Sequence, residues 1–306
     1  MKNSWIVGLA VGFWSCASQP APKQIPEEVL LCGDQTALIV DAARSDSSHL
    51  EVLWKWEVKD AMGQIPYDLM PHFRNLDECK FVDEGYRVLI TCGAGGVVLL
   101  DRATRNCMFY AYAPLAHSAD LLPDGRIAVA LSLHDRGNAI QLYEIGKPDQ
   151  VLFRDTLYSA HGSVWLDSLR RYYALGFDEL REYSLQDWNT SAPKLKRERS
   201  WKIPGEGGHD LSAISNEQLL VSDHEGVHLF DIETETFTPF EPLQQTPHVK
   251  SVNYDPTFDR LVYTKAEEDW WTYHIYCTSP DRVLNVPHIK VYKARTWPLH
   301  RCATLP

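Results

Sequence analysis

The sequence predicts an all-β fold built from one repeated unit, and three observations support this prediction. The unit consists of a polar or charged residue, a short apolar stretch, a turn that contains Asp or Gly, and a second apolar stretch, and it occurs at least five times in 306 residues. Successive copies begin 40 to 48 residues apart, a spacing that suits a four-stranded sheet. The apolar stretches are rich in Val, Leu, Ile, Tyr and Phe, and helical periodicity is essentially absent. Such a repeat predicts sheets arranged radially in a closed ring.

The repeats define six blades. After the second apolar stretch comes a third strand, such as the one at 138–145, and then a fourth, such as the one at 107–113. The copies begin at Asp77, His117, His161, His209, Lys250 and, in truncated form, at Lys293. We therefore expect a six-bladed β-propeller of four-stranded antiparallel blades.

The first blade is expected to combine the two ends of the chain. Residues 27–41 match the second and third strands of other units, for example 216–231, and lack a first strand of their own. The segment 292–297 can supply it, so that a C-terminal strand closes the ring and removes exposed sheet edges. The alternative is a seven-bladed ring that uses residues 59–75 in an extra blade. Because this segment contains two prolines and no alternation, it is predicted to be an insertion.

The N-terminus has the pattern of an export signal. Lys2 precedes an apolar run from Trp5 to Trp14, which is long enough for a signal peptide and too short to span a bilayer. The run ends at Cys16 and is followed by a small, proline-bearing tether. This looks like a bacterial lipoprotein signal with Cys16 as the lipidated residue. Because Phe13 stands where Leu is usual, cleavage after Ser15 without lipidation stays open.

This pattern predicts three parts: a signal peptide at 1–15, a lipidated Cys16 with its tether at 16–26, and a single propeller domain at 27–306. The expected location is the periplasm or the cell surface, with a lipid anchor in the bacterial outer membrane as the only membrane contact. The net charge of −11 and the lack of clustered Lys and Arg argue against a nucleic-acid partner. We expect a monomer.

The remaining cysteines leave two possibilities open. Six are left when Cys16 is set aside, namely Cys32, Cys79, Cys92, Cys107, Cys277 and Cys302. In an oxidising compartment they can form bridges, and their connectivity does not follow from the sequence. Cys79 and Cys92 flank a turn at 83–85 and either face each other across a hairpin or are buried free thiols.

The first residues of the repeats form the predicted site. In a propeller they face one another around one mouth of the central channel, and the loops between second and third strands lie on the same face. Three imidazoles and two ammonium groups on an acidic protein suit an anionic ligand. The predicted catalytic residues are His117, His161 and His209, and the predicted ligand-binding residues are Lys250, Lys293, Glu78, Asp178, Asp223, His224, Trp270 and Trp271. An exposed indole in the loop that holds Trp270 and Trp271 would stack on a sugar ring.

Two alternatives assign the histidines other roles. In one, His209 is a structural residue bonded to Asp223, as in WD-type propellers. In the other, His117, His161 and His209 hold a divalent metal, although the neighbouring lysines would repel a dication. We expect no cofactor. No phosphate-binding loop, nucleophile elbow, Cys-x-x-Cys or zincin pattern occurs, which argues against nucleotide-dependent chemistry.

The repeat, the leader and the histidine-lined channel over 27–297 resemble secreted and lipoprotein β-propellers of bacteria and, more distantly, propeller-type polysaccharide lyases and rhamnosidases. Metal-dependent oligogalacturonate lyases use three channel histidines in seven blades, and six blades depart from that pattern. The first hypothesis is an envelope protein that binds an anionic carbohydrate and cleaves it as a lyase or hydrolase. In the lyase reaction a Lys or His would neutralise the acid group, and a second His or a Tyr would take the proton. The second is a non-catalytic scaffold or sensor for a protein partner. The sequence does not decide between enzyme and binder.

Overall fold

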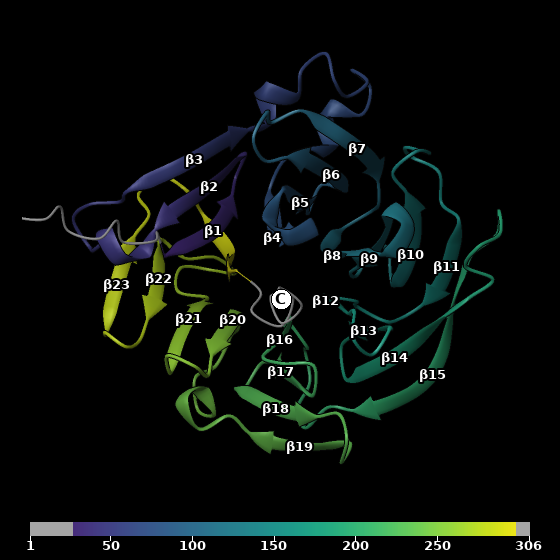
Figure 1. The fold of residues 1–306 in the computed structure, drawn as a ribbon. Helices are drawn as coiled ribbons and strands as arrows, with labels where there is room; N and C mark the ends of the chain where they lie inside the picture. Colours follow the sequence, from purple (N-terminus) through teal and green to yellow (C-terminus); the bar gives the residue numbers. More distant parts are fainter. Residues whose placement is uncertain (1–26, 298–306) are drawn as a thin grey trace, which may run out of the picture.

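In the computed structural model the chain forms a ring of six sheets around a central channel (Figure 1). The structure describes residues 27–297, so the predicted signal peptide, Cys16, the tether and Cys302 lie outside the described residues. Each sheet has four antiparallel strands, which confirms the six-bladed propeller and shows that the seven-bladed alternative is wrong.

The blades follow one another around the ring in sequence order. Their strands, from the channel outwards, are β24, β1, β2 and β3 (Val291–Thr296, Glu28–Gly33, Thr36–Asp41, Val52–Glu57); β4 to β7 (Leu76–Val82, Arg87–Cys92, Gly96–Asp101, Cys107–Tyr112); β8 to β11 (Ala116–Leu122, Arg126–Leu131, Ala139–Glu144, Phe153–Thr156); β12 to β15 (Gly162–Leu166, Arg171–Leu175, Glu179–Gln186, Lys194–Lys202); β16 to β19 (Asp210–Ala213, Gln218–Ser222, Val227–Asp231, Thr236–Pro239); and β20 to β23 (Val249–Asp255, Arg260–Lys265, His274–Cys277, Arg282–Asn285).

Tight turns join the first and second strands of the five blades that are continuous in sequence. Between β8 and β9, Pro123 restricts the backbone while Asp124 and Gly125 adopt left-handed conformations with φ of 60° and 68°. Such turns match the twist of the strands on either side and reverse the chain in three residues. The inner strands therefore all begin at the same face of the ring, which we call the upper face.

The core lies between the blades. Val98 and Leu99 are neighbours on β6 and point to opposite faces of their sheet, yet both are fully buried. Val98 packs in a cluster with Leu30 of β1, whereas Leu99 packs in a cluster with Val129 of β9. β6 is therefore apolar on both faces, because its sheet is covered by a blade on either side.

A C-terminal strand closes the ring, as predicted. β24 pairs antiparallel with β1, with Leu31 opposite Ala294 and Cys32 opposite Lys293, and the yellow end of the chain lies beside its purple beginning in Figure 1. This pairing makes β24 the innermost strand of the first blade.

A chain that ends at Lys290 is expected to lose the whole fold, because the first blade loses its inner strand and the core on both sides is exposed to water. A chain that ends at Trp297 keeps β24 and is the comparison. Far-ultraviolet circular dichroism and a thermal melt check the result. A cooperative transition in the shorter chain, at the temperature seen for the longer one, would contradict the prediction.

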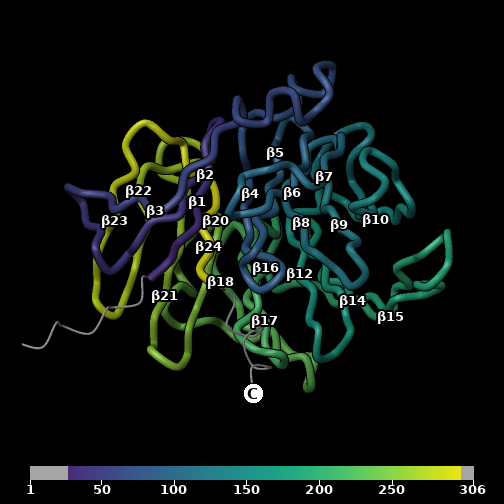
Figure 2. The backbone as a smooth tube through the Cα atoms, turned by 45° about the horizontal axis from the view of Figure 1, so that its top comes forward, coloured from purple at the N-terminus to yellow at the C-terminus, as the bar shows by residue number. Residues whose placement is uncertain are grey.

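The segment between β3 and β4 is an insertion, as predicted. It contains two short 3-10 turns, Val58–Ala61 and Met70–His72, and no strand. Phe73 is buried and lies against Gly96, which has no side chain to block it. Figure 2 shows this segment at the top of the molecule, above β5 and β6.

The described cysteines are free thiols, and the hairpin pairing of Cys79 with Cys92 is wrong. The turn at 83–85 places Cys79 opposite Ile90 and Cys92 opposite Leu76. Both thiols are buried, in agreement with the other possibility. Cys79 instead contacts Cys32 of the neighbouring blade through a hydrogen bond, and burial raises the pKa of Cys32.

Within 27–297, no helix is long and apolar enough to cross a membrane.

Candidate functional site

Three predicted histidines meet at the upper mouth of the channel. The ring centroids of His117 and His161 are 4.5 Å apart, and those of His161 and His209 are 5.4 Å apart, both pairs being edge to face. The Nζ atom of Lys250 lies 2.9 Å from Nε2 of His209. Residues that are 133 positions apart in the sequence thus share one opening, because each begins an inner strand.

A β-bulge places several of these side chains. In four inner strands the register shifts by one residue at the upper end, and the extra residue turns its side chain away from the regular ladder. These extra residues are Asp77, His117, Lys250 and Tyr292. His161 and His209 reach the same level by preceding β12 and β16 directly.

The bulge corrects two of the predicted ligand-binding residues. At the sixth repeat the residue at the mouth is Tyr292, so Lys293 lies one step deeper. At the first repeat it is Asp77, so Glu78 lies one step deeper. Both deeper side chains are almost fully buried in the channel, where no large ligand can reach them.

Lys293 and Glu78 belong to an ionic layer that closes the channel below the mouth. Lys293 lies 3.1 Å from Asp210 and 3.9 Å from Glu78. Arg295 joins the same two carboxylates, at 2.8 Å from each. Burial by itself would raise the pKa of Glu78 and Asp210, but the positive charges of Arg295 and Lys293 lower both values. The layer is a structural element that ties blades together.

The pair of His209 and Lys250 is a hydrogen bond between an ammonium donor and a neutral imidazole. Burial, with the nearby charge of Lys250, lowers the pKa of His209 to about 2. Because an ammonium can only donate, Nε2 of His209 accepts and Nδ1 carries the proton. Nδ1 is buried and has no hydrogen-bond partner among the described residues. It is therefore a donor that points to a missing acceptor.

His161 and His117 are held by different partners. Nδ1 of His161 donates to the carbonyl of Ser159 at 2.8 Å, and burial, together with His117 and His209, lowers the pKa of His161 well below its usual range. Nδ1 of His117 lies 3.0 Å from the carboxylate of Asp77. The two atoms are in close contact without hydrogen-bond geometry, since neither has a hydrogen-bond partner among the described residues. A carboxylate beside an imidazole is a pairing used in general-base catalysis.

The loops between second and third strands hold three of the predicted ligand-binding residues, and only some of these face the mouth. Asp223 is fully buried and bonds to His228 at 2.9 Å and to the backbone N–H of Gly226, so it neither faces the mouth nor holds His209. The structural pairing of Asp223 with His209 is therefore wrong. Asp178 is exposed at the rim, and the ring of His224 lies 5.1 Å from that of His209.

The two tryptophans have different surroundings. Trp270 is 41% exposed and its ring lies edge to face with that of Tyr292 at 5.5 Å. Trp271 packs against Tyr273, with the ammonium of Lys290 above its ring. Only Trp270 therefore presents an exposed indole.

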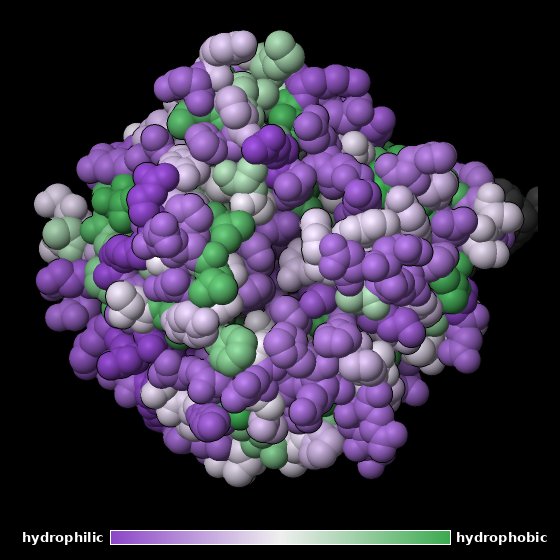
Figure 3. Space-filling model, turned by 180° about the vertical axis from the view of Figure 1, so that it is seen from behind, coloured by the Kyte–Doolittle hydropathy of each residue, from purple (hydrophilic) through white to green (hydrophobic). Residues whose placement is uncertain are grey.

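Figure 3 shows the face of the ring opposite to that of Figure 1, where hydrophilic residues dominate and hydrophobic ones form small separate groups.

The arrangement does not suit a metal ion. In the part of the chain that the structure describes, no group of three His, Cys, Asp or Glu side chains could hold one. The imidazoles meet edge to face, and Nε2 of His209 is already bonded to Lys250. The three histidines do not fit the metal alternative.

The family model for DUF6528, a family of unknown function, matches residues 15–306. The chain belongs to this family. Among solved structures, the WD40 β-propeller domain of Doa1 is similar with a TM-score of 0.57 and 10% sequence identity, over 86% of this chain and 76% of that one. At this identity the likeness shows the propeller fold alone. No curated protein matches the chain.

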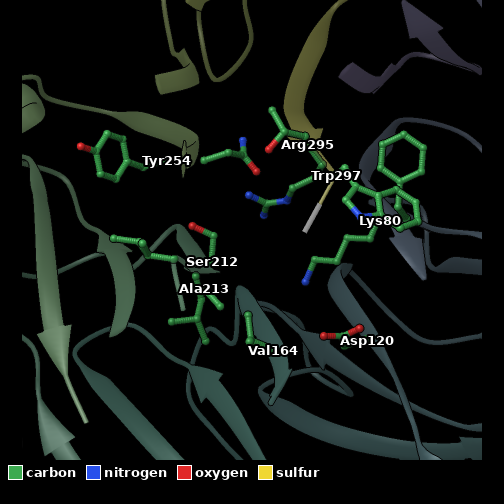
Figure 4. A pocket seen from close by; sticks show the side chains of 13 residues that line it. Lys80, Asp120, Val164, Ser212, Ala213, Tyr254, Arg295 and Trp297 are labelled. Atoms are coloured by element: carbon green, nitrogen blue, oxygen red, sulfur yellow. The ribbon is translucent and has the colours of Figure 1, made fainter. Parts of the chain in front are cut away.

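The other end of the channel in this DUF6528 propeller holds a pocket of about 620 Å³ of empty space, part of it open to solvent (Figure 4). Lys80, Arg295 and Ser212 point into it. However, Lys80 donates to Ser163, Arg295 is held by its two carboxylates, and Ser212 donates to the carbonyl of Val252. These polar groups already have partners, so the upper mouth is the better candidate site.

Proposed function

We propose that the upper mouth of the channel binds an anionic carbohydrate. The observation that carries this proposal is Lys250, which is 6% exposed and has no carboxylate within ion-pair distance among the described residues. Lys293, one layer below, has two carboxylates within that distance, those of Asp210 and Glu78. A buried ammonium without an ion-pair partner is costly. Burial and the charge of Lys293 lower the pKa of Lys250 to about 8, and the more distant charge of Asp269 offsets this only in part. A ligand carboxylate would supply the missing charge.

The neighbouring groups favour a sugar as the carrier of that charge. The neutral imidazole of His209 can donate a hydrogen bond to a hydroxyl group without attracting a second anion, and Nε2 of His161 already accepts from a hydroxyl group, that of Ser132, at 3.4 Å. Nδ1 of His209 still needs an acceptor, and Trp270 offers an exposed indole for stacking on a pyranose ring. Because the predicted leader exports the chain, the proposed ligand is a uronic-acid polysaccharide of the cell envelope or its surroundings.

The dyad of Asp77 and His117 supports lyase activity as a second function of the same site. With the uronate carboxylate on Lys250, Nε2 of His117 would take the proton from the adjacent carbon. The released electron pair forms a C=C bond, the C–O bond to the next sugar breaks, and water protonates the leaving oxygen. Hydrolysis needs two carboxyl groups free to act on one bond, whereas Glu78, next to Asp77, is bonded to Arg295. Lyase chemistry is therefore preferred to hydrolysis.

Lys250→Met is expected to lower the affinity for a uronic-acid oligosaccharide at least tenfold, because a charge-assisted hydrogen bond to the carboxylate is lost. Titration calorimetry on the full chain measures the effect. Lys55→Met, which removes an exposed ammonium on the outer strand β3, is the matched control and should bind like the unchanged protein. A carboxyl-reduced oligosaccharide should bind the unchanged protein as weakly as the acidic one binds Lys250→Met. Unchanged affinity in Lys250→Met would refute the proposal.

A further inference from the structure

A continuous series of ring contacts crosses the upper mouth. Successive centroid distances are 6.3 Å, 5.1 Å, 5.4 Å, 4.5 Å, 6.0 Å and 5.5 Å. The rings in this series are those of Phe177, His224, His209, His161, His117, Tyr292 and Trp270. The mouth thus has an aromatic floor, with Lys250 bonded to the imidazole of His209 near its middle.

Each end of this floor carries an exposed aromatic side chain. At one end Trp270 leans on Tyr292 of the first blade. At the other end Tyr158 is 55% exposed, and its ring lies 5.6 Å from that of Phe177. The backbone N–H of Phe177 donates to the carbonyl of Tyr158, and Gly176 allows this close approach. This backbone hydrogen bond therefore holds the loop of Tyr158 against the loop of Phe177.

The two platforms lie on different blades of the ring. Trp270 lies in the loop between β21 and β22 of the blade of β20 to β23, whereas Tyr158 precedes β12 and Phe177 precedes β14 in the blade of β12 to β15. One blade, that of β16 to β19, separates them along the ring, and Figure 1 shows β20 and β12 on either side of the centre. A single sugar ring can cover one platform but not both.

We infer that the mouth takes an oligosaccharide of at least two sugar rings, which stacks on Trp270 and on Tyr158 while its acidic group meets Lys250 between them. Only one part of this inference, the placement of the acidic group on Lys250, rests on the proposed function. The two platforms make Tyr158 a residue that selects ligand length, a role that no charge or repeat position in the sequence indicates.

The test is a titration of the full chain with uronic-acid mono-, di-, tri- and tetrasaccharides of one linkage, and with a carboxyl-reduced tetrasaccharide. Affinity for the acidic series is expected to rise at least tenfold from the monosaccharide to the trisaccharide. Tyr158→Ala and Trp270→Ala should each lower trisaccharide affinity by about 2- to 10-fold, the range for one aromatic contact. Phe258→Ala, which removes an exposed aromatic at the lower turn between β20 and β21, is the control and should change nothing. Near-ultraviolet circular dichroism checks that each variant is folded.

The outcomes separate this inference from the proposed function. Equal affinity for the monosaccharide and the trisaccharide, or an unchanged trisaccharide affinity in folded Tyr158→Ala, would overturn the two-platform inference even if Lys250→Met abolishes binding. If the carboxyl-reduced tetrasaccharide binds as well as the acidic one and still depends on Tyr158 and Trp270, the platforms stand and the anionic part of the proposed function fails. Absence of binding by every saccharide would overturn both.

Discussion

Arg295→Met is expected to destabilise the whole propeller by about 3–5 kcal/mol, the usual cost of leaving a buried charge without its partner. Arg295 is buried on β24 and bonds to Glu78 on β4 and to Asp210 on β16. Without it two buried carboxylates depend on Lys293 and on Lys80, which lies 3.5 Å from Glu78. Because three blades meet at this point, the loss should appear as one cooperative transition about 10 °C lower.

Denaturant unfolding measures this effect, and a double variant tests its cause. Arg87→Met removes an ion pair with Asp83 that is open to solvent, so it should cost less than about 1 kcal/mol. The combination of Arg295→Met with Glu78→Met removes a charge of each sign, so it should be more stable than Arg295→Met alone. A single variant within about 1 kcal/mol of the unchanged protein would show that the ionic layer does not hold the blades together.

The architecture could be predicted because its cause is periodic. Recurrence every 40 to 48 residues indicated the number of blades, and the missing first strand at 27–41 indicated closure by 292–297. Both followed from the need to bury apolar strands and to leave no open sheet edge. The convergence of His117, His161 and His209 followed from the same repeat, since equivalent positions meet at the channel.

The site could be predicted only to within one residue. A β-bulge changes which side chain faces the mouth without changing the repeat, so Lys293 and Glu78 were placed one layer too high and Tyr292 was missed. Hydrogen-bond partners also escaped prediction. Asp223 bonds to His228 on the neighbouring strand of its own blade, and no sequence pattern distinguishes this pairing from one with His209.

The aromatic platform at Tyr158 and Phe177 could not be found from the sequence. Both residues lie in loops, outside the repeated strands, and neither has a charge that stands out against the composition. Their contact depends on a backbone hydrogen bond and on Gly176, which are features of the folded chain. His248 was missed for a similar reason, since its ring meets that of His224 through two loops of the upper face.

Acidification is expected to destabilise the protein by about 4 kcal/mol between pH 7 and pH 5. His161 and His209 have pKa values far below the unfolded value of about 6.5, chiefly because they are buried. Below pH 6.5 the unfolded chain therefore binds protons that the folded chain does not, and each histidine costs about 1.4 kcal/mol per pH unit. The stability that these two neutral imidazoles contribute is fully present above pH 6.5 and is lost as the pH falls.

Urea unfolding at several pH values measures this slope. His209→Asn should remove about half of it between pH 6 and pH 5, whereas His49→Asn, at an exposed position, should leave it unchanged. The carboxylates of Glu78 and Asp210 have lowered pKa values, so their contribution is lost only below about pH 4.5 and does not overlap with this window. An unchanged slope in His209→Asn would show that this imidazole is protonated in the folded protein.

The same titration bears on the binding site, because the charge of Lys250 is one cause of the low pKa of His209, second only to burial. An anion on Lys250 would cancel that charge and raise the pKa of His209, so that the folded protein binds protons more readily. By linkage the ligand should then bind more tightly, and stabilise the protein more, as the pH falls. We therefore expect a larger rise in melting temperature with a uronic-acid oligosaccharide at pH 5 than at pH 7, and no such difference in Lys250→Met. A neutral oligosaccharide carries no charge to cancel that of Lys250 and should raise the melting temperature equally at both pH values.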